Sequence, residues 1–145
     1  MSKGAVFCAP EDSLAVAAGA MFKRDCGMLP VVSGSKVVGA VTDRDIAIAA
    51  STRDLPPSQI RVGEISDRKP VTCSPGDKVE NALAKMRKQR VRRLPVVDAD
   101  GALAGLISLA DILHASKRKK ALRKPVLKAA RKICAPCPIV LGEIE

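Results

Sequence analysis

Two copies of one pattern run along this sequence, and this internal repeat constrains the fold more than any other feature. With a shift of 65 residues, the first copy aligns with the second from residues 8 and 73 to residues 32 and 97. The second copy then gains one residue within 98–101, and the shift becomes 66. The aligned segments are 8–12 with 73–77, 29–32 with 94–97, and 39–45 with 105–111. Such self-similarity indicates one supersecondary unit present twice.

Each copy predicts the element order β-α-β-β-α. Helical spacing of apolar residues, Pro and Asp at helix starts, and Gly-, Ser- and Asp-rich turns between apolar runs support this order. The predicted elements are a β segment (5–8; 71–73), a helix (13–25; 78–89), a first strand (29–32; 94–97), a second strand (37–41; 103–107) and a closing helix (from Thr42; from Ser108).

The repeat predicts an α+β fold (α/β by some schemes) in which the two copies pack on each other about a pseudo-twofold axis. Each copy has a small sheet with helices on one side, so the other face needs a cover. The predicted organisation is repeat 1 over 1–50, a linker over 51–61, repeat 2 over 62–116 and a basic C-terminal extension over 117–145. Residues 58–66 are expected to form a short helix leading into the second copy, and the first copy has no matching leader.

The net charge of +10 is concentrated near the C-terminus, where 117–132 holds nine Lys or Arg and no acidic residue. Residues 117–133 predict a basic helix, broken near Pro125, with an apolar stripe that docks on this chain, a second subunit or an acidic partner. A basic run also attracts nucleic acid. Two Phe and no Tyr or Trp leave few base-stacking platforms, which disfavours that alternative.

The sequence has no long apolar run and no signal-peptide pattern, so we expect a cytoplasmic protein without membrane contact. Its five cysteines are then mostly free thiols, with Cys8 and Cys73 as small core residues. Cys134 and Cys137 have the spacing of redox dithiols and zinc half-sites. Because partner ligands are lacking and His114 is the only histidine, no metal site is predicted.

One Thr/Ser-x-x-Asp motif occurs in each copy, at Thr42 and Asp45 and again at Ser108 and Asp111. Each hydroxyl follows a strand and opens a helix, where free N–H groups and partial positive charge suit phosphate. The Asp one turn later can accept hydrogen bonds from ribose hydroxyls, so the spacing fits a nucleoside phosphate. The alternative is a capping box, which satisfies the helix's own N–H groups.

The sequence resembles the CBS-domain (cystathionine-β-synthase repeat) family over roughly residues 1–116. The resemblance is carried by Leu-Pro-Val-Val at 29–32 and 94–97 and by the Gly-apolar-apolar-Thr/Ser-x-x-Asp stretches at 39–45 and 105–111. It implies a small CBS pair that binds AMP, ADP, ATP, S-adenosylmethionine or a related ligand in clefts between the repeats. It also implies a homodimer, with an adenosine-type regulatory ligand and no required cofactor.

The two sites are expected to differ because a phosphate needs a cation. The first motif contains Arg44, whereas the second copy contributes Arg92 and Arg93, and Arg suits bidentate phosphate contact. The resemblance places adenine near Val6 in one half and Val71 in the other. In the first half, where no matching leader is expected, we expect one wall of this pocket to be open. That site is then weak, or the chain was trimmed, or the C-terminal segment covers it.

The leading hypothesis for function is a regulatory sensor that binds an adenosine-type ligand and signals to an unknown protein target by conformational change. One alternative is a structural CBS dimer with vestigial sites that acts as a scaffold, and another is nucleic-acid binding through the basic segment. An enzyme is not expected, because the sequence lacks a phosphate-binding loop, a dinucleotide motif and a second histidine.

Overall fold

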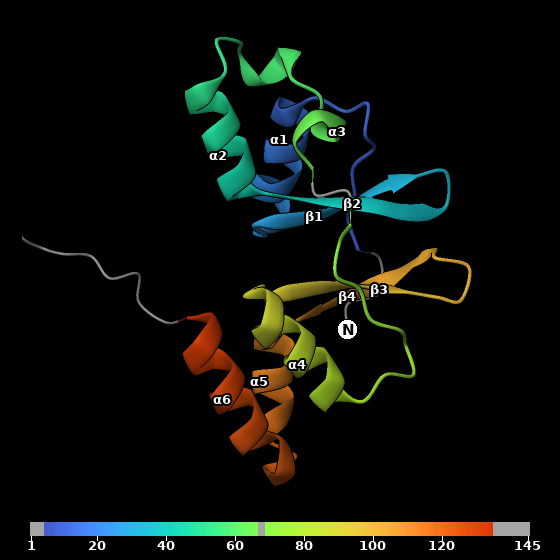
Figure 1. Cartoon of the computed structure of the whole chain (residues 1–145), viewed down its shortest axis with the longest axis vertical. Coiled ribbons are helices and arrows are strands. Elements are labelled where there is room, and N and C mark those ends of the chain that lie inside the picture. The colour runs from blue at the N-terminus through green and yellow to red at the C-terminus, as the bar shows by residue number, and fades with distance from the viewer. Residues whose placement is uncertain (1–4, 67–68, 135–145) are drawn as a thin grey trace, which may run out of the picture.

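The computed structural model describes residues 5–66 and 69–134, which form two similar halves stacked on each other. In Figure 1 the two β-hairpins face each other at the centre, and the helices lie above and below them. The first half contains α1 (Leu14–Arg24), β1 (Met28–Ser33), β2 (Lys36–Thr42), α2 (Asp43–Thr52), a 3-10 turn (Pro57–Gln59) and α3 (Val62–Ile65). The second contains α4 (Val79–Gln89), β3 (Arg93–Val97), β4 (Leu103–Ser108), α5 (Leu109–Ser116), a 3-10 turn (Lys120–Leu122) and α6 (Arg123–Ile133). The predicted paired α+β architecture is therefore correct.

The first helix of each half ends at an equivalent residue in the left-handed conformation. Asp25 has φ 48° and Arg90 has φ 55°, and their N–H groups donate to carbonyls in the last helical turn. At its start, α1 is capped by Ser13, whose Oγ accepts a hydrogen bond from the Val16 N–H at 3.3 Å. A side-chain cap of this kind satisfies an N–H that the helix itself leaves unpaired.

Both hairpins have the same register and the same irregularity. Thr42 pairs with Met28 and Ser108 pairs with Arg93, so the residue that begins each closing helix lies opposite the first residue of the hairpin. A β-bulge follows Val31 in one hairpin and Val96 in the other. The register matters for the site, because it fixes which side chain lies beside each Thr/Ser-x-x-Asp motif.

The predicted β segments at 5–8 and 71–73 are shorter than expected. Each is a single parallel bridge, from Cys8 to Val31 and from Cys73 to Val96. Two backbone hydrogen bonds hold each bridge, including Val32 N–H to the Cys8 carbonyl at 2.8 Å. The Pro that follows within two residues ends the pairing, because proline has no N–H to donate.

Each half has its own aliphatic core. In the first half Leu14 and Leu29 are fully buried, and in the second Met86 and Leu94 are. Cys8 and Cys73 are buried core members, as the sequence indicated. Burial raises the pKa of the Cys8 thiol to about 11, with a further contribution from Asp12.

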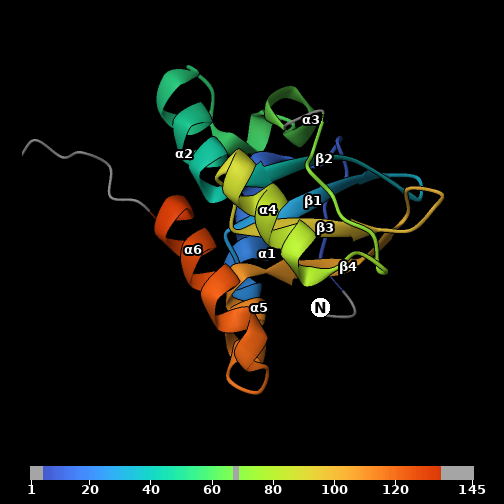
Figure 2. The same cartoon turned by 60° about the horizontal axis from the view of Figure 1, so that its bottom comes forward.

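Each core is closed by the segment that follows its second helix. Ile60 and Val62 are fully buried in the first core, although the sequence placed them in a helix leading into the second copy. That expected single helix is also divided, into the 3-10 turn Pro57–Gln59 and the four-residue α3. In the second half the closing segment is the basic helix α6, which buries Val126 and Ala129 against α4 and α5. Figure 2 shows α6 beside α4 and α5.

Proline 125 does not break the basic helix. Pro125 is the third residue of α6, in the first turn, where no intrahelical N–H bond is lost. The helical path instead changes just before α6, at the 3-10 turn Lys120–Leu122. Of the three docking partners considered for this segment, the structure shows one, which is the chain's own second half.

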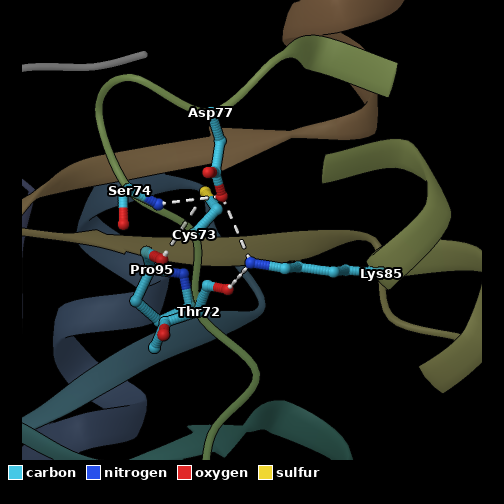
Figure 3. A network of polar contacts seen from close by, with 6 residues as sticks. All are labelled: Thr72, Cys73, Ser74, Asp77, Lys85 and Pro95. Atoms are coloured by element: carbon cyan, nitrogen blue, oxygen red, sulfur yellow. Dashed lines mark hydrogen bonds and ion pairs between the residues drawn. The ribbon is translucent and has the colours of Figure 1, made fainter. Parts of the chain in front are cut away.

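A polar network distinguishes the second half from the first (Figure 3). The Lys85 ammonium donates to the Thr72 carbonyl at 2.9 Å and forms an ion pair with Asp77 at 3.2 Å. The Asp77 carboxylate also accepts from the Ser74 N–H. The pKa of Asp77 is lowered, first by that backbone hydrogen bond and then by Lys85. Ala20 occupies the position equivalent to Lys85 in the first copy, so the first half lacks this network.

Across residues 5–66 and 69–134, no helix is both long and apolar enough to cross a membrane.

Candidate functional site

The two Thr/Ser-x-x-Asp motifs form matching capping boxes at the first turns of α2 and α5. The Thr42 hydroxyl and N–H donate to Asp45 Oδ2 at 2.6 and 2.9 Å, and the Asp45 N–H donates back to Thr42 Oγ1 at 3.1 Å. In the second half the corresponding distances for Ser108 and Asp111 are 2.7, 2.8 and 3.0 Å. The capping alternative from the sequence is thus present at both motifs, and the question is what capacity remains for a ligand.

Each Asp uses one carboxylate oxygen for the cap and leaves the other open. The hydrogen bonds that described residues make to Asp45 and Asp111 all end on Oδ2. An ionised carboxylate accepts at both oxygens. Both side chains are half-buried rather than sealed in the core. Each Oδ1 can therefore accept a hydrogen bond from a hydroxyl of a bound molecule without loss of the cap.

The carboxyl of Asp111 is held in its ionised form. Burial raises its pKa, but the hydrogen bonds from the Ser108 hydroxyl and N–H, together with the charge of Arg93, outweigh burial and leave the pKa below its ordinary value. Ionisation keeps the carboxylate an acceptor at both oxygens near neutral pH.

The hairpin register makes the two motifs electrostatically different. It places the half-buried Arg93 opposite Ser108, whereas the equivalent Met28 opposite Thr42 is buried and uncharged. The surroundings of the two motifs therefore differ in charge at one pair of equivalent positions, Met28 and Arg93. An anion at the start of α5 would meet both the helix dipole and a guanidinium.

Arg93 also reaches the first half. An open hollow of about 660 Å³ is lined by residues of α1, of α2 and of the loop between α1 and β1, together with Arg93 from β3. Asp25, Cys26, Gly27 and Asp43 contribute to this lining. The hollow lies across the boundary between the two halves and contains both signs of charge.

Sequence reasoning missed Gly27 and Asp43. A Cβ on Gly27 would lie 2.6 Å from Asp43 Oδ2, so only a glycine at position 27 leaves room for the Asp43 carboxylate where it lies. Comparison of the two copies could have indicated both residues, because Gly27 aligns with Arg92 and Asp43 aligns with Leu109 in the second copy. Positions at which the two copies differ in charge or size mark the places where the halves have specialised.

The remaining predicted site residues are two arginines and two valines. Arg44 and Arg92 are exposed, and no ion pair between described residues involves either one. Val6 and Val71 are half-buried and pack against the first and second cores. Val6 and Val71 therefore present only part of their surface to a ligand.

The described cysteines, Cys8, Cys26, Cys73 and Cys134, are free thiols. Cys134 is exposed, and its predicted partner Cys137 lies outside the described residues. Within 5–66 and 69–134 no group of three or more His, Cys, Asp or Glu side chains is arranged to hold a metal ion.

Residues 1–51 and 62–118 match the family model of the CBS domain. Together with the paired hairpins and the twin capping boxes, this match defines the class of protein. The chain belongs to the CBS-domain family and contains two CBS repeats.

Similar proteins share this pair of repeats. The CBS domain-containing protein YhcV of Bacillus subtilis is 34% identical over 105 residues, which cover 71% of this chain and 72% of that protein. Inosine-5′-monophosphate dehydrogenase of Nitrosopumilus maritimus is 35% identical over 74% of this chain. This chain spans only about a fifth of the length of that dehydrogenase and of the similar ones from two other organisms.

Solved structures of similar proteins include ligand complexes. The CBS-domain pair of protein MJ0100, in complex with 5′-methylthioadenosine and S-adenosyl-L-methionine, is 28% identical. The match has a TM-score of 0.73 and covers 82% of this chain and 93% of that one.

Proposed function

We propose that this CBS pair is a regulatory sensor that binds an adenosine-type ligand at the boundary between its halves. The observation that carries the proposal is the pair of carboxylates, Asp45 and Asp111, each of which uses only Oδ2 for hydrogen bonds with described residues at a helix N-terminus. A ribose has adjacent hydroxyls that can donate hydrogen bonds to a carboxylate oxygen. The start of a helix suits a polar or anionic group attached to that sugar.

The two sites are proposed to prefer ligands of different charge. Arg93 pairs with Ser108 across the hairpin, at the start of α5, so a phosphate is favoured there. At the start of α2, Asp43 and Asp45 place two carboxylates in the first turn against one guanidinium, that of the exposed Arg44, which favours a neutral or cationic adenosine there. MJ0100, whose CBS pair holds 5′-methylthioadenosine and S-adenosyl-L-methionine, supports the second preference by similarity.

The ligand is proposed to act on an interface between two copies of the chain. Some of the large exposed apolar side chains lie on helices α1 and α2 of the first half, where Phe22 is 89% exposed. Val16 and Ile48 are also more than half exposed, at 57% and 53%. Large exposed apolar side chains on neighbouring helices favour association, and a homodimer would place the ligand sites near its interface. We propose regulation rather than catalysis as the role of this assembly, with an as yet unidentified protein as its target.

The test is calorimetric titration of the folded protein with AMP, ATP, 5′-methylthioadenosine and S-adenosylmethionine, repeated on Asp45→Ala and Asp111→Ala. Asp98→Ala is the matched control. Its carboxylate also accepts two backbone N–H bonds, at 3.0 and 2.8 Å, but it lies in the β3–β4 turn away from both motifs.

Micromolar binding that is lost in one Asp variant and kept in Asp98→Ala would support the sensor and assign the site. The phosphorylated ligands should depend on Asp111 and the others on Asp45. If the folded, ligand-free protein binds none of the four, the caps are purely structural. In that case the second candidate function, a scaffold dimer, becomes the better interpretation.

A further inference from the structure

A basic groove runs between α4 and α6, and the ligand sites do not account for it. One hollow of about 780 Å³ is lined by Arg87, Lys124, Leu127, Lys128, Arg131 and Lys132. A second hollow of about 330 Å³ shares three of these cations and adds Leu83, Ala84 and Pro125. We call the two together the α4–α6 groove. It has a rim of Lys and Arg and a floor of aliphatic side chains.

The cations of the groove are not neutralised within the described part of the chain. Both ion pairs that link described side chains lie elsewhere, at Arg53–Glu64 and Lys85–Asp77. Glu80, at the α4 end of the second hollow, is the one acidic side chain among the lining residues. The positive potential of the groove is therefore available to a partner.

The helix that forms one wall is anchored, so its outer face is presented in a fixed orientation. Val126 and Ala129 hold the inner face of α6 in the second core. Leu127 lies outside that core and is 55% exposed, and it lines the first hollow together with Lys124, Lys128 and Arg131. An exposed Leu among cations is a suitable anchor for an apolar contact.

We propose that the α4–α6 groove binds an acidic amphipathic peptide segment of a partner protein. Carboxylates of the segment would face the Lys and Arg rim, and its apolar residues would cover Leu127 and the aliphatic floor. This is helix-in-groove recognition with charge complementarity. A nucleic acid fits less well, because phosphates gain nothing from an aliphatic floor and the groove has no aromatic side chain.

The experiment measures fluorescence anisotropy of three labelled probes added to the full chain. The first is a synthetic helical peptide of about 16 residues with Leu along one face and Glu elsewhere. The second replaces each Leu by Ser and keeps the charge. The third is a DNA duplex of about 20 base pairs. The variants are Leu127→Ser and the double reversal Lys128→Glu with Arg131→Glu, at exposed positions where folding should be retained.

Lys23→Glu with Arg24→Glu is the matched control, since it makes the same change of charge at exposed residues of α1. We expect the Leu peptide to bind, the groove reversal to weaken binding by roughly tenfold or more at low salt, and the control to weaken it by less than about threefold. Leu127→Ser should weaken binding of the Leu peptide and leave the Ser peptide unchanged.

Three outcomes would overturn the proposal. Equal binding of the Leu and Ser peptides would mean that only charge is recognised. Tighter binding of the duplex, lost in the same groove variant, would assign the groove to nucleic acid. Absence of binding by every probe, or equal loss in groove and control variants, would leave the groove without a peptide-binding role.

Discussion

Replacing Val126 by Ala tests whether the basic helix is part of the second core. Val126 is 1% exposed and belongs to the core cluster formed with α4 and α5. The substitution removes two buried methyl groups, worth about 0.8 kcal/mol each, and leaves a small cavity that adds to the cost. The expected loss in the free energy of unfolding is about 1.5–3 kcal/mol.

The neighbouring Leu127 provides the control. It is 55% exposed on the same helix, so Leu127→Ala should cost less than about 0.5 kcal/mol, although it removes more atoms. The assay is urea denaturation followed by circular dichroism. With a slope of about 2 kcal/mol per molar urea, the midpoint of Val126→Ala should fall by about 1 M and that of Leu127→Ala should hardly change. Equal shifts would refute the packing of α6 described above.

Charge and thiol chemistry give three more predictions. Exposed Cys134 should react with Ellman's reagent in the folded protein at least about tenfold faster than Cys8, whose burial raises its pKa to about 11, and equal rates would contradict this. Ser108→Ala should cost about 0.5–2 kcal/mol at pH 7. Because the pKa of Asp111 is lowered in the folded protein, its ionised carboxylate contributes stability above the ordinary carboxyl pKa, and this contribution is lost as the pH falls through the folded pKa. The cost of Ser108→Ala should therefore shrink below about pH 4. A constant cost from pH 7 to pH 3 would be inconsistent with this reasoning. Lys85→Met should raise the pKa of Asp77 in an NMR titration, but only partly, because the Ser74 N–H makes the larger contribution; an unmoved pKa would argue against the ion pair.

Local signals in the sequence predicted local structure well. Ser13 and Thr42 each precede a helix, and both cap it in the structure. Comparison of the two copies also predicted the hairpins and the unequal surroundings of the two motifs. Each of these features depends on residues near one another in the chain or on alignment of the repeat, which a single sequence contains.

Packing partners could not be predicted in the same way. The apolar stripe of α6 indicated that the helix docks, but helical spacing does not specify the surface it covers. Ile60 and Val62 follow the first repeat and precede the second, so their sequence position is compatible with either core. Gly27 and Asp43 were not predicted, because their contact depends on how the loop before β1 packs against the start of α2, which the alignment of the copies does not specify.

The position that closes each core accepts very different pieces of chain. In one half it is filled by a four-residue helix and in the other by an eleven-residue helix. Only the inner residues, such as Val62 and Val126, are fixed by this role. The outer surface of the longer helix is free to diverge in sequence, because no core residue lies there. A duplicated unit of this kind can therefore exchange one protein partner for another over evolution while its fold and the boundary between its halves stay the same.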